Sequence, residues 1–334
     1  MSKPVKWGVL GAAKIATEKV IPAMQRASLC QIEAIASREL SRAKESAGAL
    51  GIPRAYGSYE ELLADPEIEA IYNPLPNELH VPWTLKALAA GKHVLCEKPI
   101  ALDAAEAAQL LEARAKSGKL VAEAFMVRHH PQWRRAREIV RSGAIGEVGA
   151  IQTLFTYRLL DADNLRNKPP GGGGLYDIGC YAILTARYIF AAEPIRVAAC
   201  LDVDPNFGTD RLASAILEFP GGRHLTFTTA TQLAAAQRVV IAGTAGRVEV
   251  KIPFNAPTDR ATEIVIDSGA DLVGGAARVE TFPVCDQYGL QGDDFSRAIR
   301  GEAALEFALE DAIANMKVIE ACFRAAKSGR WETV

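Results

Sequence analysis

The segment Glu97-Lys98-Pro99 places an acid, a base and a fixed turn just after the apolar run 93–95. Ligands of open parallel sheets bind at the carboxyl ends of strands, and this segment would lie at such an end. A lysine there can present a positive charge to a substrate oxygen, and the proline sets the backbone direction. An exposed turn with two solvated charges is the alternative interpretation.

Asp177 and Tyr181 form a second candidate pair, preceded by the four glycines 171–174. Residues four apart share one face of a helix. An acid and a phenol on an otherwise apolar helix are costly unless they are paired. The glycines would let the backbone approach another group closely, or act as a hinge. The alternative is a helix-start aspartate that interacts with the helix dipole, next to a core tyrosine.

A nucleotide-binding turn is predicted near the start of the chain. The apolar run 5–10 reads as a buried strand, small residues follow at Gly11, Ala13 and Ala16, and an amphipathic pattern continues through residue 24. This spacing resembles the GxGxxG fingerprint with two glycines replaced by alanine. A plain strand–helix turn would look similar. The predicted cofactor residues of the turn are Gly11, Ala12, Ala13, Lys14 and Ile15.

Ser37 and Arg38 follow the second predicted strand, 32–36, where an NAD site usually has an acid. A hydroxyl and a guanidinium suit a 2′-phosphate instead, because arginine binds phosphate in a bidentate manner. Arg42 and Lys44 add positive charge one turn later. We therefore predict NADP rather than NAD. A solvated helix start would also account for the arginines.

The elements that position these residues fall into two patterns. Predicted strands and helices alternate up to about residue 125, as in a parallel sheet covered by helices. From 195 to 282 short strands and glycine turns follow one another, and helices at 288–300 and 307–328 close the chain. We predict an α/β protein with a Rossmann domain over 1–124 and an α+β domain over 125–334 whose open sheet is mainly antiparallel. The C-terminal helix is a candidate to pack back on the first domain.

Composition limits the class of protein. The chain has 334 residues, 49% of them hydrophobic, and a formal charge of −2, which favours neither nucleic acid nor membrane as partner. Six scattered cysteines and five histidines show no metal-ligand spacing, so we expect no metal and reduced thiols in a cytoplasmic protein. An open sheet with one free face often pairs with its own copy, which predicts a homodimer or a dimer of dimers.

Three segments carry a resemblance to a known family: 7–16, 71–80 (Ile-Tyr-Asn-Pro-Leu-Pro-Asn-Glu-Leu-His) and Glu97-Lys98-Pro99. The chain resembles the glucose–fructose oxidoreductase/inositol dehydrogenase (Gfo/Idh/MocA) family over essentially its whole length. Within it, the chain is most similar to the branch of dimeric dihydrodiol dehydrogenases and NADP-dependent D-xylose dehydrogenases. Tyr181, where many members have histidine, favours this branch over the inositol dehydrogenases.

The resemblance implies the site residues. Lys98, Asp177 and Tyr181 match the three family residues that meet at the nicotinamide, and Glu97 matches one expected at the nicotinamide ribose. Tyr288 belongs to a segment that resembles one returning to the active site. The remaining cofactor residues of this assignment are Asn73, Pro74, Leu75, Asn77, His80, Met126 and Arg128.

These residues predict hydride exchange between a nicotinamide and a carbon bearing oxygen. Tyrosine has a reference pKa of about 10, which a neighbouring lysine cation lowers. We expect Tyr181 to act as acid and base, Lys98 to stabilise the developing oxyanion, and Asp177 to hold Lys98 or a substrate hydroxyl. Lys98 as the immediate proton donor is the opposite assignment.

The substrate prediction rests on a polar segment. Arg158, Asn164 and Arg166 offer several donors to a polyhydroxylated ligand, although a solvated loop would look alike. The branch resemblance implies an aldose oxidised at C1 or a trans-dihydrodiol. Two alternatives remain open: a non-catalytic NADP-binding regulator, and an NAD-dependent eliminase or glycosidase with transient hydride transfer.

Overall fold

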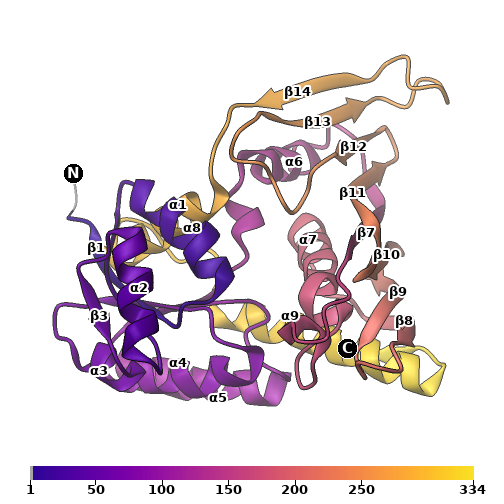
Figure 1. Ribbon diagram of the computed structural model, residues 1–334. Coiled ribbons are helices and arrows are strands. Elements are labelled where there is room, and N and C mark those ends of the chain that lie inside the picture. The colour runs from indigo at the N-terminus through magenta and orange to yellow at the C-terminus, as the bar shows by residue number, and fades with distance from the viewer. Residues whose placement is uncertain (1–2) are drawn as a thin grey trace. The chain divides into compact units, whose positions relative to one another are not determined.

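The computed structural model describes residues 3–334 and divides the chain into two compact units (Figure 1). The first unit contains the residues up to Met126 together with Asp286–Met316, and the second contains Val127–Cys285 and Lys317–Val334. The first boundary lies two residues beyond the predicted one. The segment 286–316 differs more, since it was predicted within the domain 125–334 and lies in the first unit.

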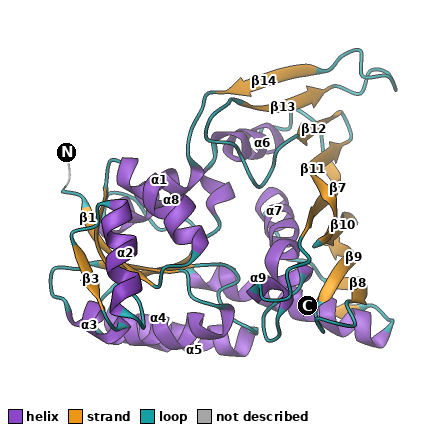
Figure 2. Ribbon diagram, viewed as in Figure 1, coloured by secondary structure: helices purple, strands orange, loops and turns teal. Residues whose placement is uncertain are grey.

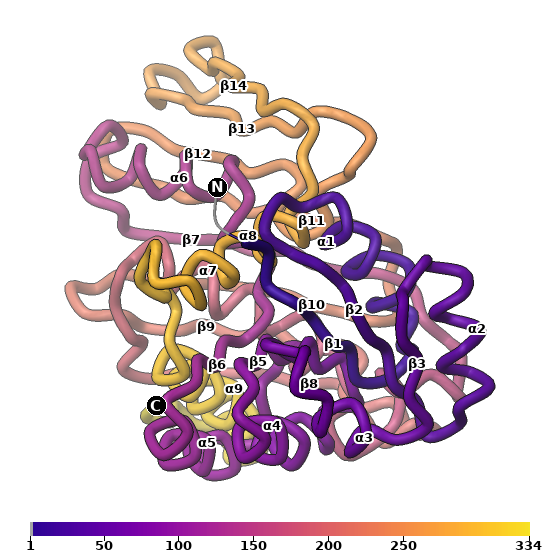
Figure 3. Tube along the Cα trace, turned by 90° about the vertical axis from the view of Figure 1, so that its left-hand side faces the viewer, coloured from indigo at the N-terminus to yellow at the C-terminus, as the bar shows by residue number. Residues whose placement is uncertain are grey.

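The first unit is built on a six-stranded parallel sheet in the order β3-β2-β1-β4-β5-β6. The traces of β1, β2 and β3 can be followed side by side in Figure 3. The strands are β1 Val5–Leu10, β2 Cys30–Ala36, β3 Arg54–Tyr56, β4 Ala70–Asn73, β5 His93–Cys96 and β6 Val121–Glu123.

Helices connect these strands, as the alternating pattern predicts. Their ends carry ordinary signals: Asp103 accepts the Glu106 N–H at the start of α5, and Gly118 ends that helix with a φ of 64°. The helical segments of the unit are η1 Ala16–Val20, α1 Ile21–Arg26, α2 Leu40–Leu50, α3 Tyr59–Ala64, η2 Asn77–Leu79, α4 His80–Ala89, α5 Ala104–Ser117 and α8 Gln287–Ile299.

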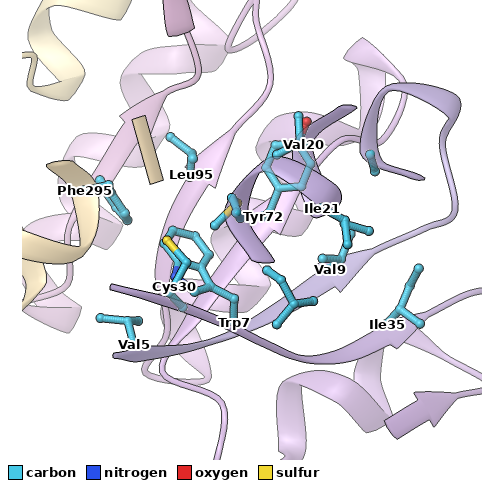
Figure 4. Packing of buried hydrophobic residues seen from close by; sticks show 14 of the residues in the cluster. Val5, Trp7, Val9, Val20, Ile21, Cys30, Ile35, Tyr72, Leu95 and Phe295 are labelled. Atoms are coloured by element: carbon cyan, nitrogen blue, oxygen red, sulfur yellow. The ribbon is translucent and has the colours of Figure 1, made fainter. Parts of the chain in front are cut away.

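The core of this unit explains why α8 (Gln287–Ile299) belongs to it. Phe295 of that helix is 2% exposed, and its ring centroid lies 5.7 Å from that of Trp7 (Figure 4). The carboxylate of Asp293 accepts the backbone N–H of Leu29 at 2.7 Å. Apolar packing and a buried carboxylate contact therefore fix α8 beside β2, which the sequence pattern alone does not indicate.

The second unit has a nine-stranded sheet in the order β14-β13-β12-β11-β7-β10-β9-β8-β15. Its pairs are antiparallel except β7 with β10, which are parallel. The strands are β7 Val148–Arg158, β8 Arg196–Val203, β9 Asp210–Phe219, β10 Arg223–Ala230, β11 Gln232–Gly243, β12 Gly246–Val250, β13 Thr262–Asp267, β14 Arg278–Phe282 and β15 Glu332–Thr333.

Helices lie along one face of this sheet, and α7 contacts β7 and β10 (Figure 2). Side chains alternate along each strand, so Ile151 and Phe155 of β7 are buried on the helix side whereas Leu154 is exposed on the other. The remaining helical segments are η3 Met126–His129, α6 Pro131–Arg141, η4 Leu165–Asn167, η5 Leu175–Gly179, α7 Cys180–Phe190 and α9 Leu309–Ser328, whose first residues belong to the first unit.

The predicted fold class is confirmed: a parallel α/β sheet is followed by an open, mainly antiparallel one. Strands β3, β13, β14 and β15 were not individually predicted. Strands β3 and β15 have only three and two residues, and β13 and β14 flank the glycine-rich segment 268–277. Within residues 3–334, no helix combines the length and the apolar character that a membrane span requires.

Candidate functional site

The turn after β1 has the shape that a nucleotide phosphate needs. Gly11 has a φ of 83°, in the left-handed region that favours glycine, and its N–H donates to Ala36 O at 2.7 Å. A Cβ on Gly11 would lie 3.0 Å from Leu75 Cδ2, so a side chain would also be crowded there. Helical structure begins within a few residues of this turn and supplies the N-terminal N–H groups that bind anions.

A positively charged pair lies beyond the carboxyl end of β2. Arg38 and Arg42 are exposed. Burial raises the pKa of Tyr59, and the charges of both arginines oppose this effect, so both lie near the Tyr59 hydroxyl. Arg42 also approaches the nucleotide turn, donating to Ala12 O at 3.5 Å, while Ser37 is 7% exposed. The residues that could meet a 2′-phosphate therefore lie together, next to the glycine turn after β1.

The loop after β4 is held in shape by hydrogen bonds of its own side chains. Asn73 is fully buried, its amide donates to His80 O at 3.1 Å, and its oxygen accepts the Leu75 N–H at 3.3 Å. The ring of His80 contacts the carbonyls of Leu75 and Pro99. Of the residues predicted to contact the cofactor, Asn73 and His80 thus have side chains that shape the loop, whereas Asn77 is half-buried at the start of η2.

Glu97 and Lys98 stand at the carboxyl end of β5, as predicted. Glu97 accepts the hydroxyl of Tyr72 at 2.7 Å, and its backbone N–H donates to Asn73 O at 3.0 Å. Burial raises the pKa of Tyr72 well above its usual value, and the charge of Glu97 adds to this effect, so Tyr72 is a neutral donor that orients the carboxylate. Lys98 is half-buried, and its peptide bond to Pro99 is cis.

Asp177 lies at the centre of a polar cluster in the second unit. Tyr157 donates its hydroxyl to Asp177 Oδ2 at 2.5 Å, and Arg166 Nε lies 3.3 Å from Oδ1. The Asp177 carboxylate raises the pKa of Arg166, with smaller contributions from Tyr157 and Tyr181. Both carboxylate oxygens are thus oriented by side chains from β7 and the loop 159–170, and a cation lies close to both tyrosines.

Tyr181, four residues after Asp177, lies in an aromatic environment. Its side chain is 6% exposed, with ring centroids 6.1 Å from Phe155 and 5.5 Å from Phe254. These two phenylalanines stack at 4.6 Å. The ring of a residue predicted to move a proton is therefore held rigidly, within a largely apolar shell.

The glycine run before Asp177 is closely packed. A Cβ on Gly173 would lie 2.0 Å from Asp210 Oδ1, and the φ of Gly173 is 109°. Asp210 is 4% exposed and accepts the Leu175 N–H at 2.7 Å. Burial raises the pKa of Asp210 to about 7, although hydrogen bonds from backbone N–H groups, that of Leu175 first, lower it. Of the two roles considered for the glycines, the structure supports close approach.

The other predicted substrate residues lie in different places. Arg158 is the neighbour of Tyr157 on β7, so the pleat directs it to the opposite face of the sheet, away from Asp177. Asn164 caps η4 by accepting the Arg166 N–H at 3.1 Å, which helps to position Arg166. Tyr288 lies on α8 and packs against the first unit's core. Met126 and Arg128 are both buried.

Tyr157 and Asp210 were missed by the sequence reasoning. The alternation of β7 could have indicated Tyr157, because Phe155 and Tyr157 share the face that turns to the helix. Asp210 shows no local signal, since it reaches the glycines only through the fold. Lys98 belongs to the first unit, whereas Asp177 and Tyr181 belong to the second. Among residues 3–334, no cluster of three histidine, cysteine or acidic side chains could hold a metal ion.

Comparison with known proteins gives consistent results. Residues 5–125 match the oxidoreductase family with an NAD-binding Rossmann fold, and residues 133–249 match the GFO/IDH/MocA C-terminal domain. An uncharacterized oxidoreductase of Rhizobium meliloti is 51% identical, over 99% of each chain. A D-xylose 1-dehydrogenase (NADP(+)) of Haloferax volcanii is 38% identical, over 97% of this chain and 98% of the relative.

Among solved structures, a 3-ketoreductase from Actinomadura kijaniata, determined with NADP and TDP-benzene, is 30% identical. It superposes with a TM-score of 0.89 over 97% of this chain and 98% of its own. Both family domains match in the expected order along the chain, and the relatives and the solved structure match over nearly its whole length. The chain belongs to the GFO/IDH/MocA family of oxidoreductases.

Proposed function

We propose that this protein is an NADP-dependent oxidoreductase that moves hydride between the nicotinamide and a hydroxyl or carbonyl carbon of a sugar or related polyol. The observation that carries the proposal is the arrangement around Asp177. Its carboxylate is oriented by Tyr157 and Arg166, and Tyr181 follows one helical turn later in an aromatic shell. An acid–base residue needs this combination of a fixed position and a tuned polar neighbour.

NADP would be held by the residues of the first unit. Gly11 and the following small residues would admit the pyrophosphate, and Arg38 with Arg42 would bind the 2′-phosphate. When bound, this cofactor supplies the hydride acceptor or donor. The xylose dehydrogenase relative is named for NADP, and the 3-ketoreductase was solved with it, which supports the choice over NAD.

In the proposed chemistry, Tyr181 removes the substrate hydroxyl proton during oxidation and returns it during reduction. Lys98 stabilises the oxyanion that develops on the substrate oxygen, as the family resemblance implies. Asp177, already bound to Tyr157 and Arg166, aligns these groups or a neighbouring substrate hydroxyl. Replacing Tyr181 by Phe and Lys98 by Met, one at a time, separates this assignment from one in which Lys98 delivers the proton.

The donors and acceptors near Asp177 support the proposed substrate class. Arg166 is half-exposed and offers its remaining N–H groups to a hydroxylated ligand, while the carboxylate offers acceptors. An aldose oxidised at C1 is the first candidate, since the xylose dehydrogenase relative is full length and 38% identical. A trans-dihydrodiol is the second, as the branch resemblance implies.

A second copy of this chain would cover the open face of the nine-stranded sheet. Leu154 is 39% exposed and Ile216 is 44% exposed on this face, where they lie on β7 and β9, the two strands that flank β10. Small side chains, Ala198 and Cys200, continue the surface across β8. We expect light scattering to show a homodimer that Ile216→Glu dissociates. Leu272→Glu, on the loop before β14, is the matched control and should leave the mass unchanged.

The test of the activity is absorbance at the NADPH band with NADP and a panel of aldoses and diols, repeated with NAD. Growth of the band with one substrate and NADP, and its loss in Lys98→Met, is the expected result. If the band never changes while NADP still raises the melting temperature, the dehydrogenase proposal fails. Product formed without net reduction of the cofactor would instead indicate an eliminase or glycosidase.

A further inference from the structure

His80 is a buried ring between two backbone segments of the first unit. It is 1% exposed, with Nδ1 2.7 Å from Pro99 O and Nε2 2.7 Å from Leu75 O. Its own carbonyl accepts the amide of Asn73 at 3.1 Å, so backbone and side chain are both fixed. The family resemblance implied that His80 contacts the cofactor, but both ring nitrogens face carbonyl oxygens.

The two carbonyls belong to segments with separate tasks. Leu75 lies against the nucleotide turn, where its Cδ2 is 3.0 Å from the position of a Cβ on Gly11. Pro99 follows Lys98 directly, so its backbone position determines where the lysine side chain begins. A single ring thus lies between the loop that supports the cofactor turn and the turn that carries the candidate catalytic cation.

The two contacts also have unequal chemistry. A carbonyl oxygen only accepts hydrogen bonds, and a neutral imidazole has a single N–H. The pKa of His80 is lowered to about 4, chiefly by burial and to a smaller extent by the charge of Lys98, although the two carbonyls oppose these effects. At neutral pH, therefore, one proton serves two acceptors, and the tautomer decides which segment receives the hydrogen bond.

We propose that His80 is a positioning residue whose ring joins the Leu75 loop to the Pro99 turn, so that cofactor binding and the placement of Lys98 depend on one buried side chain. The part of this proposal that concerns Lys98 rests on the proposed function. The part that concerns the effect of His80 on NADP binding does not. Because both ring nitrogens face backbone carbonyls, His80 acts through the two backbone segments that it joins.

The test compares NADP affinity in three variants by isothermal titration. His80→Phe keeps a ring but has no donor, and we expect the Kd for NADP to rise at least tenfold. His80→Gln restores N–H donors and should recover part of the loss. Thr84→Val is the matched control, because Thr84 lies on the same helix, is equally buried and contacts Asn73, but neither carbonyl. Its Kd should stay within threefold of the unsubstituted protein. Equal affinity in His80→Phe overturns the proposal.

A second measurement does not depend on the folding of a variant. Imidazole nitrogen NMR of the unsubstituted protein should show one His80 N–H protected from exchange, and both ring nitrogen shifts should change when NADP saturates the protein. A rapidly exchanging N–H, or shifts that NADP leaves unaltered, would contradict the proposal. If no substrate turns over while these NADP responses hold, the proposed function fails and the inference about His80 stands.

Discussion

The hydroxyl of Tyr157 lies 2.5 Å from Oδ2 of Asp177, on the side of the carboxylate opposite to its contact with Arg166. The carboxylate therefore has a phenol donor at one oxygen and a guanidinium at the other. Such contacts stabilise the ionised acid and restrict its rotation. Asp177 is therefore the centre of a three-residue unit, which Tyr157 completes together with Arg166.

Tyr157→Phe should lower kcat/KM about 10- to 100-fold, because a hydrogen bond to a charged group is worth roughly 1.5–3 kcal/mol. Initial rates with NADP and the best substrate of the panel measure this effect. Tyr56→Phe is the matched control, since Tyr56 donates to Asp65 at 2.8 Å and contacts none of the candidate catalytic residues. A rate unchanged in Tyr157→Phe would show that Asp177 needs no such support.

Arg38→Ala should raise the Kd for NADP by about tenfold or more and leave that for NAD within about twofold, because only NADP carries the phosphate that a guanidinium binds. Fluorescence titration of both cofactors gives the comparison. Lys116→Ala serves as control, because Lys116 is an exposed cation on α5 and does not belong to the predicted cofactor residues. Equal weakening of both cofactors would place Arg38 away from the 2′-phosphate.

Asp210 makes stability depend on pH in an unusual direction. Its pKa is raised from 3.8 to about 7 in the folded protein, so the folded state binds the proton more tightly than the unfolded state. The associated stability is present below about pH 4 and is lost as the pH rises towards 7, by up to roughly 4 kcal/mol.

Urea unfolding between pH 4 and 8 tests this dependence. Asp210→Asn should flatten the fall in stability across that range. Asp204→Asn is the control and should leave the slope above about pH 5 unchanged, because hydrogen bonding from Gln232 lowers the pKa of Asp204 and its titration therefore lies below that pH. Parallel curves for Asp210→Asn and the unsubstituted protein would mean that Asp210 titrates as an ordinary carboxyl group.

Phe295→Ala should destabilise the first unit by about 3–5 kcal/mol, the usual effect of removing a buried phenylalanine. The ring is 2% exposed and packs on Trp7, so tryptophan fluorescence during urea unfolding reports the change directly. Arg297→Ala, which removes a surface ion pair with Asp294 on the same helix, should change stability by less than about 1 kcal/mol. A comparably small effect of Phe295→Ala would contradict the packing of α8 in this core.

Local periodicity predicted the parts of the fold that local chemistry determines. The strand 5–10 is β1, and the small residues after it include Gly11 with its positive φ. The helix α3 is one of the helices predicted to alternate with the strands, and it begins at the Ser58 cap. These features depend on neighbouring residues only, so a single sequence contains enough information for them.

Contacts between distant segments account for what was missed. Arg158 and Tyr157 are adjacent, and only the packing of one sheet face against α7 decides which of them turns toward Asp177. Asp210 accepts the N–H of Leu175, 35 residues before it and next to the glycine run, only because the fold brings separate elements together. Polar composition could suggest that the loop 159–170 binds a ligand, but it could not identify the strand residue that completes the cluster.

The return of α8 to the first unit has a consequence for how the protein can be divided. The chain passes between the units at residues 126–127, 285–286 and 316–317, so every continuous fragment that contains the whole nucleotide-binding unit also contains most of the second unit. Gly292 packs so closely that a Cβ there would lie 2.8 Å from Cys30 Sγ. A gene truncated after residue 126 would therefore encode a Rossmann sheet whose apolar surface, normally covered by α8, is exposed. A chimera that exchanges the first unit between two relatives would have to include the segment 286–316 from the same parent.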